Sequence, residues 1–217
     1  MIPGKGTLES EFGGLYRSTD GGLTSFLIDA EADRMPLFLS NHDSFAGDRP
    51  WNQLNGDVEQ YELAAATYVL ASRNPFTYYG EEVGMASASS LFGDHALRTP
   101  MSWTSDTVAA GFTTGTPFRD LSANVATHNV MDEEGVIDSL LEHYRALYRV
   151  RISYPVLAAG DMTLLSGDGD PVLVLRRDQG ATTAIVAVNY AATTQQVVAN
   201  SGRANTVFDA VFGATGQ

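Results

Sequence analysis

The polypeptide has 217 residues, of which 44% are hydrophobic and 18% charged, a composition that fits a folded domain and excludes wholesale disorder. Thirteen basic residues stand against 26 acidic ones, and this net charge of −13 without any basic run argues against a nucleic acid partner. The absence of cysteine excludes disulfides, a thiol nucleophile and thiolate metal sites. No apolar stretch approaches the roughly 20 residues of a membrane span.

Residues 1–34 are rich in glycine and acids and are predicted to form a loop followed by part of a helix. The first 14 residues have neither the positive start nor the apolar middle of a signal peptide. Either the protein stays inside the cell or its true beginning is missing, so the compartment is left open.

Residues 35–82 are predicted to form a strand, a helix and a second strand. The apolar run at 35–40 is typical of a buried parallel strand and ends in a polar loop at 41–43. A capping aspartate, Asp57, starts a helical pattern that continues to Ala71. A second strand at 76–79 follows a turn, and a helical connection of this length predicts parallel neighbours with a right-handed crossover.

The next segments indicate a long loop and a second helix. Residues 86–133 are rich in Ser, Thr and Gly and carry no regular apolar period, and a loop of this length usually has a function, so we expect it to wrap a site. Apolar residues then recur on one face from Val136 to Ile152, which predicts a helix that Pro155 ends.

After Gly160 the period changes to that of short strands separated by polar turns. Five strands are predicted, at 162–165, 172–177, 182–190, 194–199 and 205–212, and together they favour a small antiparallel β-sandwich. The predicted division is therefore residues 1–34, an α/β part at 35–156 and an all-β domain at 157–217.

Four sequence blocks, in this order and spacing, carry a resemblance to a known family. They lie at residues 38–43 (FLSNHD), 75–85 (PFTYYGEEVGM), 98–103 (RTPMSW) and 139–147 (SLLEHYRAL). Together they resemble the α-amylase family, glycoside hydrolase family 13. Over residues 35–217 the resemblance implies the last two strand-helix units of a TIM-type (β/α) barrel, followed by the family's antiparallel carboxyl-terminal domain.

The resemblance also implies roles for five residues. Asp43 is expected to be a catalytic carboxylate that binds sugar hydroxyls and helps to distort the ring, with His42 donating to a neighbouring hydroxyl and Asn41 beside them. Arg98 and Trp103 are expected to shape the rim of the sugar site; Trp103 either stacks on a pyranose ring or packs as an ordinary aromatic residue.

Two glutamates and three histidines are further candidates for functional roles. Glu81 and Glu82 follow the second strand, where they are either a general acid or a structural pair that holds loops, and the structural interpretation is favoured. His95, His128 and His143 show no metal-ligand spacing, so neither a metal nor a cofactor is assigned.

The expected activity is that of a retaining α-glucan or α-glucoside hydrolase, although the chain lacks recognisable nucleophile and general-acid blocks, which the family carries upstream. We therefore expect the chain to be the carboxyl-terminal part of a longer enzyme, inactive alone and completed by an amino-terminal segment. The alternatives are a non-catalytic sugar-binding or stabilising subunit, a glucosyl-transferring or isomerising relative such as trehalose synthase, and an unrelated β-sandwich module in which residues 41–43 do not converge.

Overall fold

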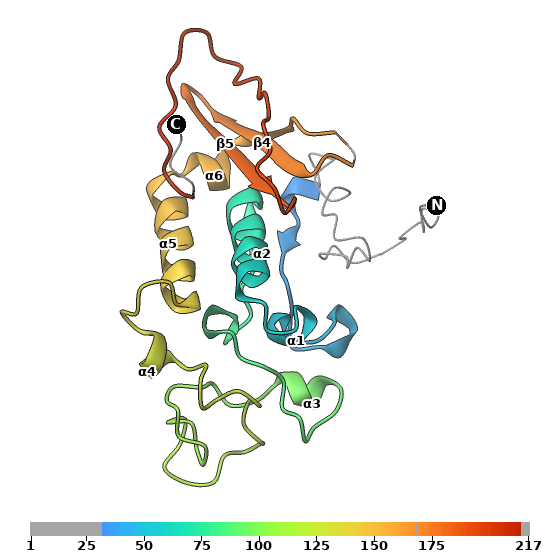
Figure 1. The fold of residues 1–217 in the computed structure, drawn as a ribbon, viewed down its shortest axis with the longest axis vertical. Coiled ribbons are helices and arrows are strands. Elements are labelled where there is room, and N and C mark those ends of the chain that lie inside the picture. The colour runs from blue at the N-terminus through green and yellow to red at the C-terminus, as the bar shows by residue number, and fades with distance from the viewer. Residues whose placement is uncertain (1–31, 168, 214–217) are drawn as a thin grey trace.

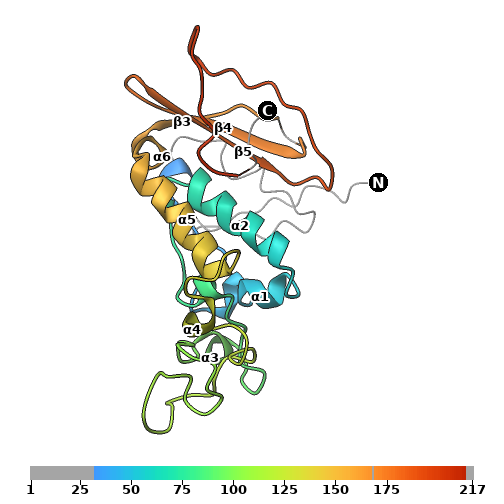
Figure 2. The same cartoon turned by 60° about the vertical axis from the view of Figure 1, so that its left-hand side comes forward.

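The computed structural model describes residues 32–167 and 169–213, so all but the last three residues of the loop and helix predicted at 1–34 lie outside the described residues. Helices α2 and α5 run side by side between an antiparallel sheet at one end and the loops of residues 86–129 at the other (Figures 1 and 2). The elements are η1 Ala32–Arg34, β1 Pro36–Leu37, η2 Ser44–Ala46, α1 Pro50–Gln53, α2 Val58–Ala71, β2 Asn74–Pro75, η3 Glu81–Val83, α3 Asp94–Leu97, α4 Val130–Glu133, α5 Leu140–Ser153, α6 Val156–Ala159, β3 Asp161–Leu164, β4 Val172–Gln179 and β5 Thr182–Asn189.

The predicted strand-helix-strand unit is present as β1, α2 and β2. The two strands are parallel, with Leu37 opposite Pro75, and the Phe76 N–H donates to the Leu37 carbonyl over 2.8 Å. Each strand is only two residues long, and the second lies at 74–75 instead of the predicted 76–79. Leu37 is buried in the core, but Met35 and Phe76 beside the strands are exposed, so the unit is only partly buried. In the described residues no third strand pairs with either outer edge.

Helix α2 is the centre of the core. It begins at the predicted aspartate, because the Asp57 side chain accepts a hydrogen bond from the Gln60 N–H at 3.0 Å. Tyr61, Ala65 and Tyr68 are fully buried on this helix. The helix packs against α5 and β2 and also against β5, so most of its circumference is covered and its apolar residues are not confined to one stripe.

We predict that Asp57→Ala lowers the free energy of unfolding by about 1 kcal/mol, because the first turn of α2 loses the acceptor for one of its unpaired N–H groups. Urea denaturation followed by circular dichroism measures the change. Glu59→Ala is the matched control, since Glu59 is an exposed acid in the same turn that does not cap the helix. Equal losses in both variants would contradict a specific capping effect.

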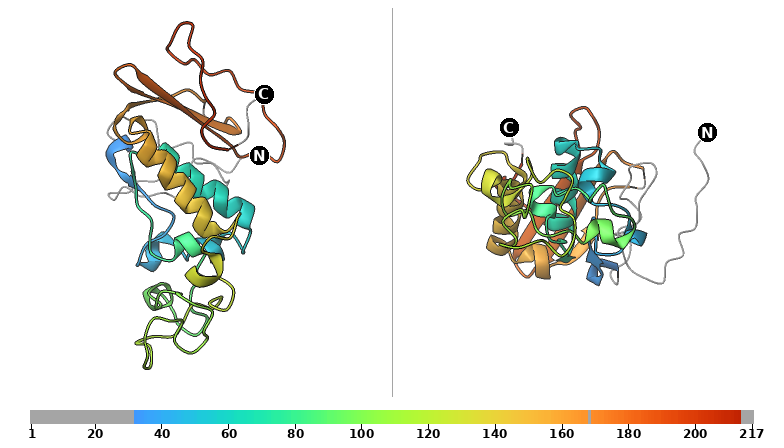
Figure 3. Two further views of the ribbon diagram at one scale, coloured as in Figure 1. Left: turned by 90° about the vertical axis from the view of Figure 1, so that its left-hand side faces the viewer. Right: turned by 90° about the horizontal axis from the view of Figure 1, so that it is seen from below.

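Helix α5 begins at Leu140, four residues later than the sequence predicts. Asp138 has a φ of 67°, a left-handed conformation that a right-handed helix cannot continue through. The Ser139 side chain then caps the new helix by accepting from the Glu142 N–H at 3.3 Å. Figure 3 shows the resulting parallel pair of α5 and α2, with the sheet across the carboxyl-terminal end of both helices.

The carboxyl-terminal sheet has three antiparallel strands in the order β3-β4-β5. They correspond to the first three of the five predicted strands. The sheet packs on α2 and α6, and its inward residues Leu173, Leu175 and Val186 belong to the same apolar cluster as Tyr61 and Tyr68. The sheet and the α/β part therefore share one core.

The last two predicted strands are wrong. Residues 194–199 and 205–212 have no strand structure and run as an extended loop beyond β5 (Figure 1). Both segments carry apolar residues between polar turns, as short strands do, but Val198 is 100% exposed and Val207 is 90% exposed. A strand needs a partner for its backbone and a layer that covers its apolar face, and in the described residues no second sheet supplies them, so the sandwich reduces to one layer.

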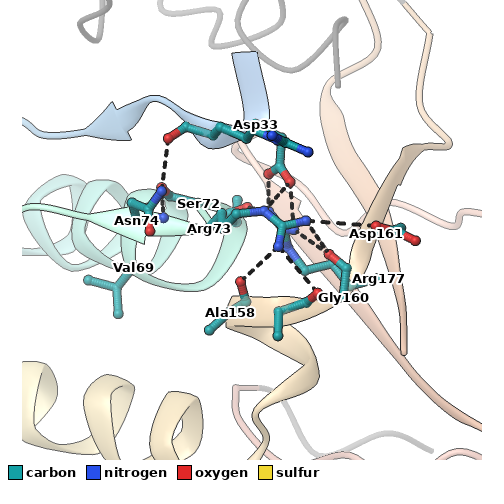
Figure 4. Close-up of polar contacts among 12 residues, drawn as sticks. Asp33, Val69, Ser72, Arg73, Asn74, Ala158, Gly160, Asp161 and Arg177 are labelled. Atoms are coloured by element: carbon teal, nitrogen blue, oxygen red, sulfur yellow. Dashed lines mark hydrogen bonds and ion pairs between the residues drawn. The ribbon is translucent and has the colours of Figure 1, made fainter. Parts of the chain in front are cut away.

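A buried polar group, the Asp33 cluster, consists of Asp33, Arg73 and Arg177 and joins η1 to β4 (Figure 4). The Asp33 carboxylate accepts from Arg73 Nε at 3.0 Å and from Arg177 Nη1 at 3.0 Å. Arg177 also donates to the carbonyls of Ala71 at 2.7 Å and Gly160 at 3.0 Å. Arg177 thereby supplies a donor for a carbonyl group at the carboxyl end of α2 that has no partner within the helix, and it attaches β4 to this end of the helix.

Among the described residues, no helix is both long enough and apolar enough to cross a membrane.

Candidate functional site

The polar loop after β1 and the start of the 98–103 block meet in space. Arg98 Nη2 donates to Asp43 Oδ1 at 2.6 Å, across 55 residues of sequence. His42 Nε2 lies 3.4 Å from Asp43 Oδ2, and the Asn41 side chain accepts from the Asp43 N–H at 2.7 Å. The structure thus brings together four of the five predicted site residues.

Arg98 is the centre of the group of Asn41, His42, Asp43 and Arg98, and it binds backbone as well as the Asp43 carboxylate. Its Nε donates to the His42 carbonyl at 2.7 Å, and its Nη2 is shared with Asp94 at 2.8 Å. Asp94 in turn accepts from the Ser44 N–H at 2.8 Å and from the Ser44 hydroxyl at 2.9 Å. The backbone on both sides of Asp43 is therefore held to the 94–98 segment.

Sequence reasoning missed Asp94. The hydrogen bond from the Ser44 backbone, together with its hydroxyl, lowers the pKa of Asp94 below the ordinary value of an aspartate. The one available signal was an acid four residues before Arg98, a spacing that pairs side chains on a helix. Its contact with Ser44, 50 residues away, has no sequence signature.

The Asp43 side chain is accessible. It is 35% exposed and that of His42 is 63% exposed, so both can contact a molecule from solvent. A carboxylate has about four acceptor positions, and Arg98 occupies one of them, which leaves positions for hydroxyl donors. An imidazole beside it donates or accepts according to its tautomer. The arrangement can bind a polyhydroxylated ligand.

Glu81 holds the start of the 41–43 loop through Ser40. Its carboxylate accepts from the Ser40 N–H at 3.1 Å and the Ser40 hydroxyl at 2.6 Å, one residue before Asn41. The side chain is fully buried, and this burial raises the pKa of Glu81 to about 8, outweighing the hydrogen bond from Ser40 and the attraction of Arg49. Glu82 accepts from the Gly80 N–H at 2.7 Å. Both glutamates thus accept hydrogen bonds from backbone N–H groups, the contacts that the structural interpretation predicts.

Arg49 is a second residue that sequence reasoning missed. Its guanidinium is fully buried and lies 4.9 and 5.0 Å from the ring centres of Tyr78 and Tyr79. It donates to the carbonyls of Tyr79 at 2.8 Å and Leu97 at 2.7 Å. Because Leu97 precedes Arg98, Arg49 joins the segment after β2 to the residue that orients Asp43. No local pattern distinguishes this arginine from a surface one.

Trp103 makes its backbone hydrogen bonds to residues outside the Asp43 group. Its backbone N–H donates to the Ala110 carbonyl at 2.9 Å and its carbonyl accepts from the Met131 N–H at 3.0 Å, while its side chain is exposed. No hydrogen bond among the described residues links Trp103 to Asp43 or Arg98, so its contact with a sugar stays a prediction. Across residues 32–167 and 169–213, no group of three or more His, Asp or Glu side chains is arranged to hold a metal ion.

Comparison with known proteins identifies the family. The sequence profile described as "Alpha amylase, catalytic domain" matches residues 23–160, which is more than half of the chain. The chain belongs to the α-amylase family. The Asp43 group lies inside the matched region, and the resemblance that rests on the four sequence blocks is confirmed.

Two curated relatives illustrate the range of this α-amylase family match. The chain is 38% identical over 125 residues to the α-amylase SusG of Bacteroides thetaiotaomicron, covering 58% of this chain and 17% of that protein. It is 29% identical over 194 residues to the probable oligo-1,6-glucosidase 2 of Bacillus subtilis, covering 70% of this chain and 33% of that protein.

Solved structures that resemble this chain include an isomaltulose synthase and an α-amylase. An isomaltulose synthase variant from Erwinia rhapontici, in complex with glucose, matches 72% of this chain and 34% of its own, with a TM-score of 0.58 and 26% identity. An α-amylase from H. orenii matches 72% of this chain and 30% of its own, with a TM-score of 0.57 and 30% identity. The chain spans about a third or less of the proteins it matches.

Proposed function

We propose that this chain supplies the sugar-contacting part of a retaining enzyme that acts on α-glucans or α-glucosides, with hydrolysis as its reaction. The observation that carries the proposal is Asp43, a half-exposed carboxylate that follows a parallel strand and is oriented by Arg98 within the family-matched region. Carboxyl ends of parallel barrel strands are where barrel enzymes keep their chemistry.

In this proposal Asp43 accepts hydrogen bonds from adjacent hydroxyls of one glucosyl unit. Such bonds strengthen as the ring distorts toward an oxocarbenium-like transition state, so they favour the reaction as well as binding. His42 contacts a neighbouring hydroxyl, while Asn41 and Arg98 hold the loop and its carboxylate in place. Trp103 is proposed to contribute to the rim of the site.

A retaining enzyme also needs a nucleophile and a general acid whose carboxyl groups are about 5–5.5 Å apart. Glu81 is fully buried and already accepts three hydrogen bonds, and Glu82 accepts from backbone, so neither suits these roles. We propose that the pair comes from further barrel strands, which would cover the open edges of the β1–β2 sheet in a barrel of roughly 250 residues.

A second candidate is glucosyl transfer or isomerisation by the same site. The similarity to a trehalose synthase/amylase and to an isomaltulose synthase favours it, since both names state the synthesis of a sugar. Both reactions would use the same sugar-binding residues around Asp43. An assay of the products distinguishes them, because glucose release indicates hydrolysis and a rearranged disaccharide indicates isomerisation.

We expect the 217-residue chain to bind maltooligosaccharides weakly, to show little or no turnover on them, and to lose about tenfold in affinity on Asp43→Asn. The substitution keeps the shape and removes a charged acceptor, and a hydrogen bond to a charged group contributes about 1.5–3 kcal/mol. Calorimetric titration with maltotriose measures the affinity, and chromatography of the sugars measures turnover.

Asp209→Asn is the control for this experiment, because Asp209 is an exposed aspartate in the segment beyond β5. Unchanged affinity in Asp43→Asn would contradict the proposed role of the carboxylate. Robust turnover by the chain itself would contradict the proposal that the nucleophile and the acid lie elsewhere. Binding without turnover, even when the rest of a barrel is supplied, would instead favour a non-catalytic sugar-binding subunit.

A further inference from the structure

Glu81 is a fully buried carboxylic acid that the proposed sugar chemistry does not use. One of its oxygens, Oε1, accepts from the Ser40 N–H at 3.1 Å and from the Ser40 hydroxyl at 2.6 Å, and Ser40 precedes residues 41–43, the Asp43 loop. The other oxygen, Oε2, accepts from the Tyr68 hydroxyl at 3.3 Å. The two oxygens of one carboxyl group therefore face two different structures, the start of the Asp43 loop and the core.

Three hydroxyl groups continue from Oε2 toward the surface. The Tyr68 hydroxyl on α2 lies 2.6 Å from the Thr77 hydroxyl after β2, and the Thr77 hydroxyl lies 2.6 Å from the Tyr148 hydroxyl on α5. Both links have the length of ordinary hydrogen bonds between hydroxyl groups. Tyr68 is fully buried, whereas Thr77 and Tyr148 are partly exposed. This hydroxyl chain of Tyr68, Thr77 and Tyr148 thus connects a carboxyl group without access to solvent with the partly exposed side of α5.

The hydroxyl chain can be polarised in either direction, because each hydroxyl group both donates and accepts. When Glu81 is protonated, Oε2–H donates to Tyr68 and every following hydroxyl donates to the next, ending at water. On deprotonation the Oε2–H bond breaks and an O–H bond forms at Tyr68. Each hydroxyl passes its own proton to the next oxygen, and the proton of Tyr148 bonds to a water molecule. The products are a carboxylate and a hydronium ion, with three neutral hydroxyl groups whose donor directions are reversed.

Charged and titratable groups from several elements face Glu81. They are Arg49 before α1, Tyr61 and Tyr68 of α2, Glu82 of η3 and Tyr144 of α5. Burial is the largest effect and raises the pKa of Glu81 to about 8, against the hydrogen bond from Ser40 and the attraction of Arg49. Burial also raises the pKa values of these three tyrosines above the ordinary 10.0, so they stay neutral.

Glu82 is the other carboxyl group in this set, and burial raises its pKa as well. It accepts from the Gly80 N–H at 2.7 Å, and among the described residues it has no hydrogen bond to Ser40 or to the hydroxyl chain. Its repulsion favours the neutral form of Glu81. Glu81 is therefore the carboxyl group that joins the Asp43 loop to the hydroxyl chain.

We propose that Glu81 is a positioning residue for the Asp43 loop and that the hydroxyl chain carries its proton to and from solvent. Ionisation puts a charge in the core beside Ser40, which raises the free energy of the folded loop, so the loop responds to pH. Without the chain, a proton this deeply buried leaves only when the fold opens locally. The effect on sugar affinity rests on the proposed function, whereas the proton path does not.

Thr77→Val tests the hydroxyl chain, because valine keeps the branched shape of threonine and removes its hydroxyl group. NMR relaxation dispersion on the amide groups of residues 40–43 at pH 8 measures the rate at which Glu81 exchanges its proton. We expect Thr77→Val and Tyr148→Phe each to lower this rate about tenfold or more, since exchange then waits for local opening. Thr77→Ser restores a hydroxyl group and should recover the rate.

Thr67→Val is the matched control, because it removes a second threonine hydroxyl from the same region. The Thr67 hydroxyl on α2 lies 3.0 Å from the Tyr190 hydroxyl and has no hydrogen bond to Glu81 among the described residues. Its loss should leave the exchange rate unchanged. Exchange as fast in Thr77→Val as in wild type would overturn the proton path, and so would equal slowing in Thr67→Val. If Thr77→Val does not fold, Tyr148→Phe at the partly exposed end decides the question.

Calorimetric titration with maltotriose at pH 7 and pH 9 tests the positioning role. We expect wild type to bind about two- to tenfold more weakly at pH 9 and Glu81→Gln to lack this difference, because an amide does not ionise. The same pH dependence in both proteins would overturn the positioning role. If wild type binds no sugar at either pH, the proposed function and the positioning role of Glu81 both fail, while the exchange rates still decide the proton path.

Discussion

Replacing Asp33 with asparagine is expected to lower the free energy of unfolding by about 3–5 kcal/mol, because it leaves two guanidinium groups without their shared buried carboxylate. Asp33 and Arg177 are almost fully buried, and Arg73 Nε contacts the same carboxylate oxygen as Arg177 Nη1. Burial alone would raise the pKa of Asp33, but Arg177 and Arg73 hold it below the ordinary value.

The chain offers a matched control for this variant. Asp161 also lies near Arg73, at 4.0 Å, but its side chain is fully exposed, so Asp161→Asn should have almost no effect. Urea denaturation monitored by circular dichroism compares the two. A loss below 1 kcal/mol in Asp33→Asn would contradict the assignment of the cluster as a major contributor to stability.

Acidification gives an independent check on the Asp33 cluster. A carboxyl group whose pKa is lowered by folding stabilises the fold above its unfolded pKa, here an ordinary 3.8, and this contribution is lost as the pH falls through the folded pKa. The difference in stability between wild type and Asp33→Asn should therefore be complete at neutral pH and shrink in strong acid. A difference that grows on acidification would contradict the ion-pair explanation.

The second large effect concerns Glu81, whose pKa rises from an ordinary 4.5 to about 8 because it is buried beneath the Asp43 loop. A group with a raised folded pKa contributes stability that is complete below its unfolded pKa and is lost as the pH rises through the folded one. Wild type should thus lose stability between about pH 4.5 and 8, at a limiting slope of about 1.4 kcal/mol per pH unit for this one group.

Glu81→Gln should remove this pH-dependent loss of stability and make the chain more stable than wild type at pH 8. A neutral amide reproduces the protonated acid: its oxygen accepts from Ser40, and its NH₂ donates to the Tyr68 hydroxyl, which lies next to the Thr77 hydroxyl at 2.6 Å. The stability of both proteins is measured by urea denaturation at intervals from pH 5 to 8. Parallel pH profiles would contradict the prediction.

Glu133→Gln is the matched variant for this experiment. Burial raises the pKa of Glu133 to about 7, so its contribution has the same sign and is lost over a narrower pH window. Glu133 accepts from the Leu141 N–H at 3.0 Å at the start of α5 and has no contact with Ser40. Only Glu81→Gln should therefore change the pH dependence of the NMR signals of residues 40–43, which report on the Asp43 loop.

The strand-helix-strand unit and the two long helices, α2 and α5, could be predicted because their signals are local, whereas the four-residue helices α3 and α4 lie in the predicted loop. Asp57 caps α2 and Ser139 caps α5 through hydrogen bonds to residues three positions away, and such patterns are readable in a single sequence. The error at the start of α5 has an equally local cause, the left-handed Asp138, but many residue types precede helices without adopting that conformation.

The last two predicted strands failed for a different reason. Short apolar segments between polar turns, such as 194–199 and 205–212, are typical of strands, yet a strand also needs a partner for its backbone and a layer for its apolar face. Val198 and Val207 have neither in the described residues. Periodicity describes what a segment can bury and does not say whether a surface is present to bury it.

Sequence by itself determined the two long helices α2 and α5, the polar loop at 41–43 and membership in the α-amylase family, because capping, periodicity and short motifs act over a few residues. Only the tertiary structure decided which charged groups are buried and what they pair with. Asp33 meets Arg177 across 144 residues, and Arg98 meets Asp43 across 55. Coulomb and desolvation energies depend on distance in space and on solvent, and neither is encoded in local spacing.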